Sequence, residues 1–587
     1  MSPTTDKTVK TTLVVGIDFG TTFSGVSWLI CKAGSPPGQP EVVSLWQTST
    51  DNRRNNSDSQ KVPSKVYYDQ NGELSWGFKI PAGVQTIEWF KLLLLNDDDL
   101  QSHLRNSSHL YDAKKSLQKL GKTAVQLVGE YLGVLWEHVL EQIKNSKGEA
   151  IINGMPIQVI LTVPAIWTDY ARDRMREAAG LAGIFDYRVA GETTLLFVSE
   201  PEAAAIATMP ELENREDLRV GDSLVVVDAG GGTVDIISYK INVLEPLSVS
   251  ECAEGGGALC GGIFLDKHFE ALLKKAVGEA SWNKMNGSDV RRLMNNEWEH
   301  GIKQAFDGEP DFYTVELPSR AQTPERQFSS DEIRPIFDKI ANQIGGLVRK
   351  QIAEVRKKTS RLPKLVILVG GFGRSPYIFK YLKQNLGCLI TVLQTRGDKP
   401  WTAICRGAAL FGAAGLSSDT VDGQQLVQSR IARLNYGIEL RHPFIEGVHD
   451  PRDKVWCNLT REWYASNQMQ WFIRRGEDMS LKKANTYDYI REWDINLKGW
   501  GVFPETIYTC PDLIPPSRKQ GNVREDNKFT IRTTKAREEY EKVSNGYCYY
   551  RRWSFSYKVV VSGASFDIAL ISDGVEQNLE KVQVDVC

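Results

Sequence analysis

The sequence predicts an α/β region of two similar lobes, followed by a β-rich sandwich. Two apolar runs end in Asp and then break into a turn rich in Gly and Thr, one at 15–23 and the other at 225–235. Strand-like and helix-like runs alternate up to residue 414, which is typical of α/β domains. Beyond residue 430, short β-rich runs are separated by turn residues, which favours an antiparallel sandwich.

Composition and charge narrow the possible functions. At 587 residues the chain exceeds what one core organises, so we expect two or three domains. The net charge of −2, without a basic block that contains aromatic residues, argues against nucleic acid as a partner. No apolar run approaches the ~20 residues that span a bilayer, and the N-terminus lacks a signal-like segment. We therefore expect no membrane partner and a cytoplasmic location, with the nucleus as an alternative.

Cysteine and histidine usage indicates neither disulfides nor a transition metal. The nine cysteines are scattered and contain no C-x-x-C pair, and the seven histidines show no ligand spacing. We predict reduced thiols.

Each Asp-glycine turn suits a bound phosphate group. A strand that runs into Gly and Thr exposes backbone N–H groups and hydroxyls, while the Asp at its end can hold a hydrated cation. The second turn has three successive glycines, which costs backbone entropy unless another group approaches the backbone closely. The first turn alone would equally suit a tight hairpin. Two copies predict a nucleotide held between two similar lobes.

Hydrophobic periodicity and turn residues predict the other elements of the α/β region. Polar composition predicts a mobile loop at 48–61. The further elements are a helical region at 115–145, a buried strand at 159–165, a helix at 169–183, a Pro-initiated helix at 199–208, a helix at 264–277, a strand at 365–369 and a small-residue helix at 404–414.

The C-terminal third has a different pattern. Short β-rich runs lie at 435–440, 470–474, 528–532, 549–557 and 566–571. The dense aromatic residues at 547–557 favour packing within a sheet over a ligand shelf. The predicted organisation is a flexible N-terminus at 1–11, a nucleotide-binding domain at 12–415, a polar linker at 416–429 and a sandwich at 430–587.

Five segments, in order, resemble the heat-shock protein 70 family within the actin and hexokinase superfamily. They are G-I-D-F-G-T-T-F-S at 16–24, V-P-A-I-W-T-D-Y-A-R at 163–172, E-P-E-A-A-A-I-A at 200–207, D-A-G-G-G-T-V-D at 228–235, and V-G-G-F-G-R-S-P at 369–376 followed by G-A-A at 407–409. The resemblance covers roughly residues 12–415. It implies a two-lobed actin-like ATPase domain of ribonuclease H-like fold, with ATP or ADP and Mg²⁺ as ligands.

The resemblance also implies roles for single residues. Asp18, Glu200 and Asp228 would surround Mg²⁺ largely through water, and Asp235 would lie beside the attacking water. Lys91 resembles the lysine that positions this water, with an ordinary solvated lysine as the alternative. Together, Lys91, Glu200, Asp228 and Asp235 would form the catalytic group, which suits a phosphoryl transfer that mainly needs positioning and charge stabilisation.

The implied nucleotide contacts come from both lobes. The phosphates would meet Gly20, Thr21, Thr22, Phe23, Gly230, Gly231, Gly232 and Thr233, and the ribose and base would meet Lys303, Gly370, Gly371 and Arg374, with the Arg374 guanidinium stacked on the base. Pro164 and Arg172 resemble the relay between nucleotide state and the second domain. The alternatives are a strand-ending proline and a helix-surface arginine.

Three departures from the family pattern are visible. No leucine-rich acidic linker occurs at 416–429, no helical lid is expected before the chain ends at Cys587, and Trp401 stands where the family usually has an acidic residue. We therefore predict a divergent, lidless member that resembles the heat-shock-70-like proteins of fungi and their animal relatives.

The leading functional hypothesis is an ATP-binding, slowly hydrolysing, chaperone-like protein. Its expected partners are an extended peptide or protein client and a co-chaperone or exchange factor. One alternative is a signalling or scaffold module that holds nucleotide with negligible hydrolysis. A small-molecule kinase is disfavoured because Glu200 and Lys91 suit water activation and the β-rich region would have no role. A filament-forming actin relative is disfavoured because the appended sandwich is foreign to that group.

Overall fold

The structure is a computed structural model, and it describes most of residues 11–585. The residues outside the description are 1–10, 33–34, 50–58, 82, 101–104, 106–107, 166, 168, 213–214, 246, 322, 396, 398, 418–425, 480–483, 498–500, 533–535, 563–564 and 586–587. The predicted flexible N-terminus, most of the predicted loop at 48–61 and the middle of the predicted linker at 416–429 therefore lie outside the described residues.

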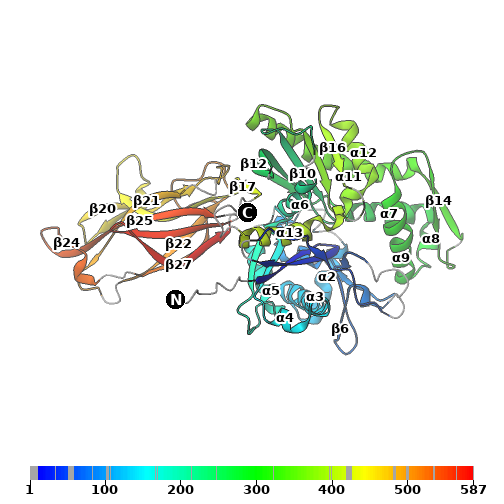
Figure 1. The fold of residues 1–587 in the computed structure, drawn as a ribbon, viewed down its shortest axis with the longest axis horizontal. Coiled ribbons are helices and arrows are strands. Elements are labelled where there is room, and N and C mark those ends of the chain that lie inside the picture. Colours follow the sequence, from blue (N-terminus) through cyan, green and yellow to red (C-terminus); the bar gives the residue numbers. More distant parts are fainter. Residues whose placement is uncertain are drawn as a thin grey trace, which may run out of the picture. The chain divides into compact units, whose positions relative to one another are not determined.

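The chain divides into two compact units (Figure 1). The first comprises Met1–Ser248 and Gly255–Leu426, and the second comprises Val249–Glu254 and Val427–Cys587. The second unit thus includes a short segment from the middle of strand β12 (Leu247–Ala258), where the sequence predicts a β-rich stretch that begins only at 430.

The first lobe of the first unit is built on a mixed sheet with the order β3-β2-β1-β8-β9, and β4 pairs with β2. β1 and β2 form an antiparallel hairpin around the first Asp-glycine turn, while β8 and β9 continue the sheet in parallel. The strands are β1 (Thr11–Phe19), β2 (Phe23–Lys32), β3 (Glu41–Val42), β4 (Val62–Pro63), β8 (Ile157–Val163) and β9 (Thr194–Ser199). A separate small sheet contains β5 (Lys65–Tyr68), β6 (Leu74–Trp76) and β7 (Ile87–Glu88).

The second lobe repeats this plan. Its sheet runs β16-β15-β10-β11-β12, with an antiparallel hairpin β10–β11 around the second turn and parallel pairing of β10, β15 and β16. The strands are β10 (Ser223–Ala229), β11 (Val234–Leu244), β15 (Leu365–Val369) and β16 (Thr391–Gln394), and a hairpin of β13 (Phe312–Glu316) and β14 (Glu325–Ser329) lies apart. β10 and β15 are buried at every residue, as apolar parallel strands covered on both faces should be.

Two helices rich in small residues lie between the sheets: α6 (Glu200–Thr208) and α13 (Lys399–Ser417) (Figure 1). α6 contacts β10 and β11, whereas α13 contacts β1, β2 and β8. The two helices also contact each other, and a Cβ added at Gly407 would lie only 1.7 Å from the carbonyl oxygen of Ala203. The close crossing therefore depends on the absence of a side chain at Gly407.

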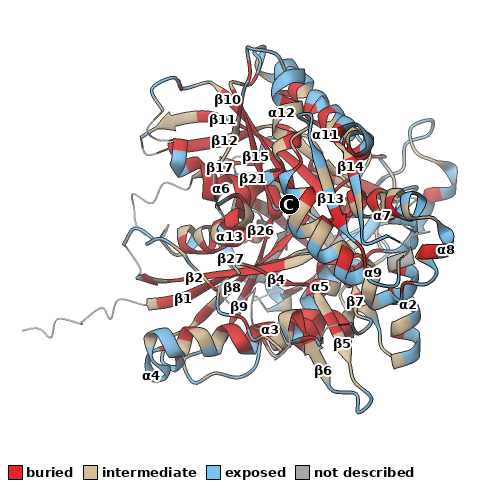
Figure 2. Cartoon of the chain, turned by 90° about the vertical axis from the view of Figure 1, so that its right-hand side faces the viewer, coloured by how far each residue is buried: buried red, intermediate tan, exposed pale blue. Residues whose placement is uncertain are grey.

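Some of the remaining helices pack on the sheets, and others pack on neighbouring helices. Figure 2 shows that α11 and α12 expose one face and bury the other, while the sheet strands are largely buried. The helices are α2 (Ser108–Leu120), α3 (Ala124–Lys147), α4 (Glu149–Asn153), α5 (Asp169–Leu181), α7 (Ile263–Val277), α8 (Glu279–Trp282), α9 (Gly287–Leu293), a π-helix (Met294–Ile302), α10 (Lys303–Ala305), α11 (Ser330–Thr359) and α12 (Pro376–Asn385). The predicted helical region at 115–145 is two helices rather than one, because the chain turns at Gly121 with a φ of +63°.

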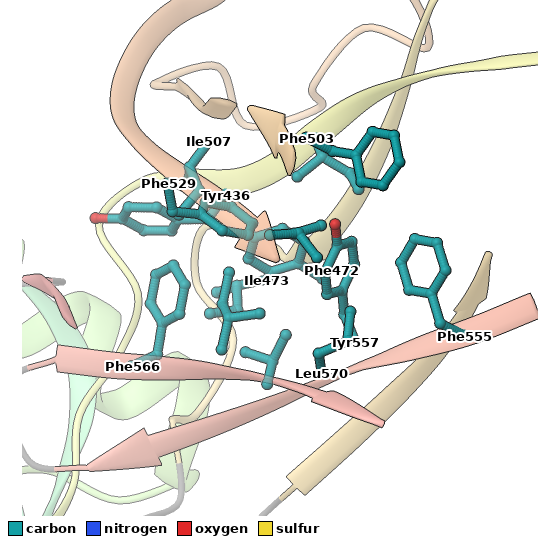
Figure 3. Packing of buried hydrophobic residues seen from close by; sticks show 14 of the residues in the cluster. Tyr436, Phe472, Ile473, Phe503, Ile507, Phe529, Phe555, Tyr557, Phe566 and Leu570 are labelled. Atoms are coloured by element: carbon teal, nitrogen blue, oxygen red, sulfur yellow. The ribbon is translucent and has the colours of Figure 1, made fainter. Parts of the chain in front are cut away.

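The second unit consists of two antiparallel sheets around a shared aromatic core (Figure 3). One sheet has the order β19-β20-β18-β22-β23, and the other has the order β21-β25-β26-β27, with β24 paired to β25. The strands of these sheets are β18 (Asn435–Pro443), β19 (Lys454–Cys457), β20 (Glu462–Ile473), β21 (Ala484–Asp494), β22 (Val502–Cys510), β23 (Arg524–Arg532), β24 (Glu541–Ser544), β25 (Tyr549–Ser562), β26 (Ser565–Ser572) and β27 (Val575–Asp585). A further short strand of this unit, β17 (Val427–Ser429), pairs in parallel with Val249 and Ser250 of β12. Trp553, Phe555 and Tyr557 of β25 are buried in this core, which confirms that the aromatic run serves sheet packing.

Helices are scarce in the second unit. Among its described residues, the only helical segments are two three-residue 3-10 turns, Pro451–Asp453 and Arg537–Glu539. In the part of the whole chain that the structure describes, no helix has both the length and the apolar character needed to cross a bilayer.

The contact between α6 and α13 generates a stability prediction. We expect Gly407→Ala to lower the free energy of unfolding by at least about 2 kcal/mol, because the new methyl group meets rigid backbone rather than a side chain that can move. Gly346→Ala, on the exposed face of α11 with open space around the added Cβ, should stabilise by about 0.5–1 kcal/mol through helix propensity. Denaturant unfolding of the full chain checks both values. Equal stability of Gly407→Ala and wild type would contradict the close crossing.

Candidate functional site

The two Asp-glycine turns face a single cleft in the first unit. The cleft has a volume of about 1840 Å³ and is lined by both turns together with residues from the α6 and α13 region. The predicted site residues that line it are Asp18, Gly20, Thr21, Thr22, Phe23, Lys91, Glu200, Asp228, Gly230, Gly231, Gly232, Thr233, Lys303, Gly371 and Arg374. The structure therefore brings most of the predicted nucleotide contacts together.

The two turns approach each other so closely that glycine is required. A Cβ at Gly231 would lie 2.2 Å from Oγ1 of Thr22, and a Cβ at Gly232 would lie 2.7 Å from Oγ1 of Thr21. The carbonyl groups of the second turn accept bonds from the start of α7: Ile263 N–H donates to Gly231 O at 2.9 Å. The carbonyls thus face α7, and the two turns form one continuous wall of the cleft.

Four predicted carboxylates are buried in this region: Asp18, Glu200 and Asp228 line the cleft, whereas Asp235 does not line it and lies opposite Asp228 in the hairpin β10–β11. Asp18, Glu200, Asp228 and Asp235 are exposed by 5% or less. Burial, with the charges of Glu200 and Asp235, raises the pKa of Asp228 well above its usual range. Burial and the charge of Glu200 raise the pKa of Asp235 to about 7. Burial also raises the pKa of Glu200, against the opposing effect of Lys91.

The carboxylates fit a hydrated magnesium ion with a polyphosphate. Oδ1 of Asp228 and Oδ2 of Asp235 are buried and have no hydrogen-bond partner among the described residues. Within the same part of the chain, no three Asp, Glu, His or Cys side chains converge closely enough to ligate a metal directly. Asp18, Glu200 and Asp228 would therefore hold the ion through water, as hard oxygen groups commonly hold Mg²⁺.

Lys91 lies inside the cleft rather than on the surface. It is 3% exposed, and its Nζ donates to Oε1 of Glu200 at 2.6 Å. The ammonium also lies 5.3 Å from the ring centre of Trp167. The alternative of an ordinary solvated lysine is therefore wrong.

Of the residues predicted to contact the ribose and base, Lys303, Gly371 and Arg374 line the cleft and Gly370 does not. Lys303 is held by Asp266 at 2.8 Å and Glu299 at 2.6 Å, and the Arg374 guanidinium lies 5.5 Å from the ring centre of Trp401. Gly370 differs from the prediction, since it does not line the cleft. Its φ is +87°, and an added Cβ would lie 2.3 Å from Oδ1 of Asp228, so this glycine makes room for the carboxylate.

Pro164 and Arg172 are both buried, and the chain directly after Pro164 contacts Asp235. Pro164 is buried directly after β8, and the next residue, Ala165, donates its N–H to Oδ1 of Asp235 at 3.0 Å. Arg172 on α5 is only 9% exposed, so the helix-surface alternative is wrong.

Sequence reasoning missed the segment that holds the first turn. Ser64 donates its N–H to Thr22 O at 2.8 Å and its hydroxyl to Gly20 O at 2.7 Å. Lys61, predicted to end a mobile loop, is instead 4% exposed and forms an ion pair with Asp18. The only local signal was the apolar pair Val62–Pro63 that follows. Trp401 also lines the cleft, with its ring 5.6 Å from that of Phe23.

The two lobes, the crossing helices and the cleft define a two-lobed actin-like ATPase fold followed by a β-rich region. A family model described as Hsp70 protein matches residues 133–455, more than half of the chain, so the chain belongs to the Hsp70 family. A second model, described as a domain of unknown function (DUF8568), matches residues 430–497.

Curated relatives are similar at low identity. Heat shock 70 kDa protein 12A of Mus musculus is 23% identical, over 80% of this chain and 78% of that protein, and the Homo sapiens protein of the same name is 22% identical with the same coverage. Chaperone protein DnaK of Thermotoga petrophila is 25% identical over 76% of this chain and 67% of its own length.

The burial of Asp235 generates a pH prediction. Because its pKa is raised to about 7, the folded protein retains a proton that the unfolded chain releases near pH 4, so stability falls as pH rises from about 4 to 7. Asp235→Asn removes the free-energy cost of ionising a buried carboxylate, while the new side-chain oxygen can still accept the hydrogen bond from the Ala165 N–H. We expect the nucleotide-free variant to gain about 1–3 kcal/mol at pH 7.5 and less at pH 5.

Chemical unfolding at the two pH values measures the gain. Asp173→Asn, at an exposed position of α5, is the control and should change neither value. A variant at Asp235 that is less stable than wild type at pH 7.5 would contradict the assigned cost of burial.

Proposed function

We propose that this chain binds ATP with Mg²⁺ in the cleft of the first unit and hydrolyses it slowly. The observation that carries the proposal is the convergence of both phosphate-type turns, the Lys91–Glu200 pair and the buried carboxylates on one cleft. Transfer of a phosphoryl group to water requires a site that positions the water and stabilises charge, and the reaction needs no covalent nucleophile from the protein. The Hsp70 family assignment supports the same function.

Each part of the cleft has a task in this proposal. The backbone N–H groups and hydroxyls of the two turns bind phosphate oxygens, and Mg²⁺, when bound, neutralises phosphate charge. Lys91 orients the attacking water because Glu200 fixes its ammonium. Oδ2 of Asp235 accepts a proton from that water, which suits a carboxylate whose pKa is raised to about 7. Arg374, Gly371 and Lys303 bind the nucleoside, and Pro164 and Arg172 relay its state.

We further propose that the second unit binds an extended peptide or protein client. Its sheets have edge strands to which a peptide can add by backbone pairing. β19 is one such edge, and Trp456 on it is 39% exposed and lies 5.1 Å, ring centre to ring centre, from Trp463 of β20, which is 48% exposed. The relatives that are named chaperones support this proposal. We also propose a co-chaperone or exchange factor as a partner and a cytoplasmic location, and the family assignment supports both.

The first test concerns hydrolysis. Lys91→Ala should lower single-turnover ATP hydrolysis by at least about tenfold and leave ATP affinity within a few-fold, because a water-positioning group acts mainly in the transition state. Calorimetry and single-turnover assays of the full chain measure both. Lys122→Ala, at a partly exposed lysine outside the cleft, is the control.

The outcomes separate the competing functions. Binding without turnover in wild type would favour the scaffold that holds nucleotide. A lack of ATP binding would remove the ATPase proposal.

The second test concerns the client. Fluorescence anisotropy with a library of extended apolar peptides should detect binding to the full chain, and Trp463→Ser should weaken it by about tenfold through loss of aromatic contact area. Tyr547→Ser removes another exposed aromatic residue and should leave affinity unchanged. If no peptide binds to the folded protein with or without ATP, the chaperone-like proposal fails.

A further inference from the structure

Lys61 is a buried cation at the base of the nucleotide cleft. Its Nζ pairs with Oδ2 of Asp18, and the residue lines the cleft beside both turns. The neighbouring chain is fixed on both sides, because Trp46 Nε1 donates to Ser59 O at 2.6 Å and β4 pairs with β2.

The approximate symmetry of the two lobes shows how Lys61 changes the site. In the hairpin β10–β11, Asp228 lies opposite Asp235, and in the hairpin β1–β2 Asp18 lies opposite Gly25. The stem of Lys61 fills the space that a side chain at Gly25 would occupy, since an added Cβ would lie 2.9 Å from Cε of Lys61. The first lobe therefore presents an ammonium where the second lobe presents a carboxylate.

Lys61 and Lys91 together supply two positive charges to the carboxylates that would surround Mg²⁺. Lys61 pairs with Asp18 and Lys91 pairs with Glu200. Two ammonium groups carry the same charge as one Mg²⁺ ion. Charges in such a buried site are screened less than charges in water, and lysine is a good point-charge ligand for phosphate.

We propose that Lys61 is a phosphate-binding residue that reduces the dependence of nucleotide binding on a divalent cation. Its ligand is the polyphosphate of a nucleoside diphosphate or triphosphate. The proposal rests on the nucleotide-binding function proposed above. Because Lys61 and a hydrated Mg²⁺ ion both require Asp18, the wild-type cleft should hold Mg²⁺ weakly and retain nucleotide after chelation.

Calorimetry of the full chain with ATP and with ADP, in excess MgCl₂ and in excess EDTA, tests the proposal. For wild type, the Kd in EDTA should exceed the Kd in MgCl₂ by less than about tenfold. For Lys61→Gln, that ratio should rise by a further factor of about ten or more, while Lys61→Arg should restore the wild-type ratio. Lys122→Gln, outside the cleft, should behave as wild type.

A second readout uses metal alone. Without nucleotide, MgCl₂ should raise the unfolding temperature of Lys61→Gln more than that of wild type, because Asp18 is then free to hold the hydrated ion. Equal Kd ratios for wild type and Lys61→Gln, or loss of wild-type binding in EDTA, would overturn the role of Lys61. If Lys61→Gln does not fold, the same calorimetry on Lys61→Arg tests the proposal. Loss of nucleotide binding by Lys61→Arg in EDTA would then overturn the phosphate-binding role and indicate that Lys61 is only structural. Absence of ATP binding to wild type in both buffers would instead overturn the proposed function.

Discussion

The contact between the two phosphate-type turns is the constraint on which the first unit depends. Gly231 and Gly232 lie against Thr22 and Thr21, so the ends of the hairpins from two different sheets must meet. Such a meeting requires the sheets to approach across α6 and α13, and these helices can cross closely only because Gly407 leaves room for the backbone at Ala203. Small residues far apart in the sequence therefore serve one geometric requirement.

Electrostatics imposes the second constraint. Burying four carboxylates in one place is costly, since each loses its hydration and repels the others. Two lysines compensate two of these groups directly, through the pairs Lys61–Asp18 and Lys91–Glu200. Among the residues that the structure describes, neither Asp228 nor Asp235 forms an ion pair with a lysine, and the pKa of each is raised. The cleft thus stores unfavourable charge that a cation and donors from a ligand can relieve.

The sequence predicts those parts of the site that depend on local patterns. An apolar strand that ends in Asp and glycine has a distinctive composition, and the alanine-rich start of α6 is visible in the same way. These patterns, with the family resemblance built on them, led to the fold class and to predicted site residues most of which line the cleft. Lys61 had no comparable signal, because a lysine at the end of a polar stretch is usually solvated, and only the paired strands β2 and β4 bring it against Asp18. Gly370 differs from Lys61, because its glycine motif was visible in the sequence. Its close approach to Asp228 could not be predicted, since it depends on how the two strands are placed in the fold.

The set of residues that makes up the second unit shows why the boundary between the two units could not be predicted from the sequence pattern alone. Val249–Glu254 belong to this unit although the 172 residues of Gly255–Leu426 separate them from its remaining part. Within it, Glu251 accepts from the backbone N–H of Ile431 at 2.9 Å and pairs with Arg433 at 2.6 Å. The Glu251 side chain is 1% exposed, and such a buried charge is stable only with a nearby partner. The β-rich unit therefore includes a strand segment from within the α/β region, so the change in composition near residue 430 does not mark the whole boundary between the two units.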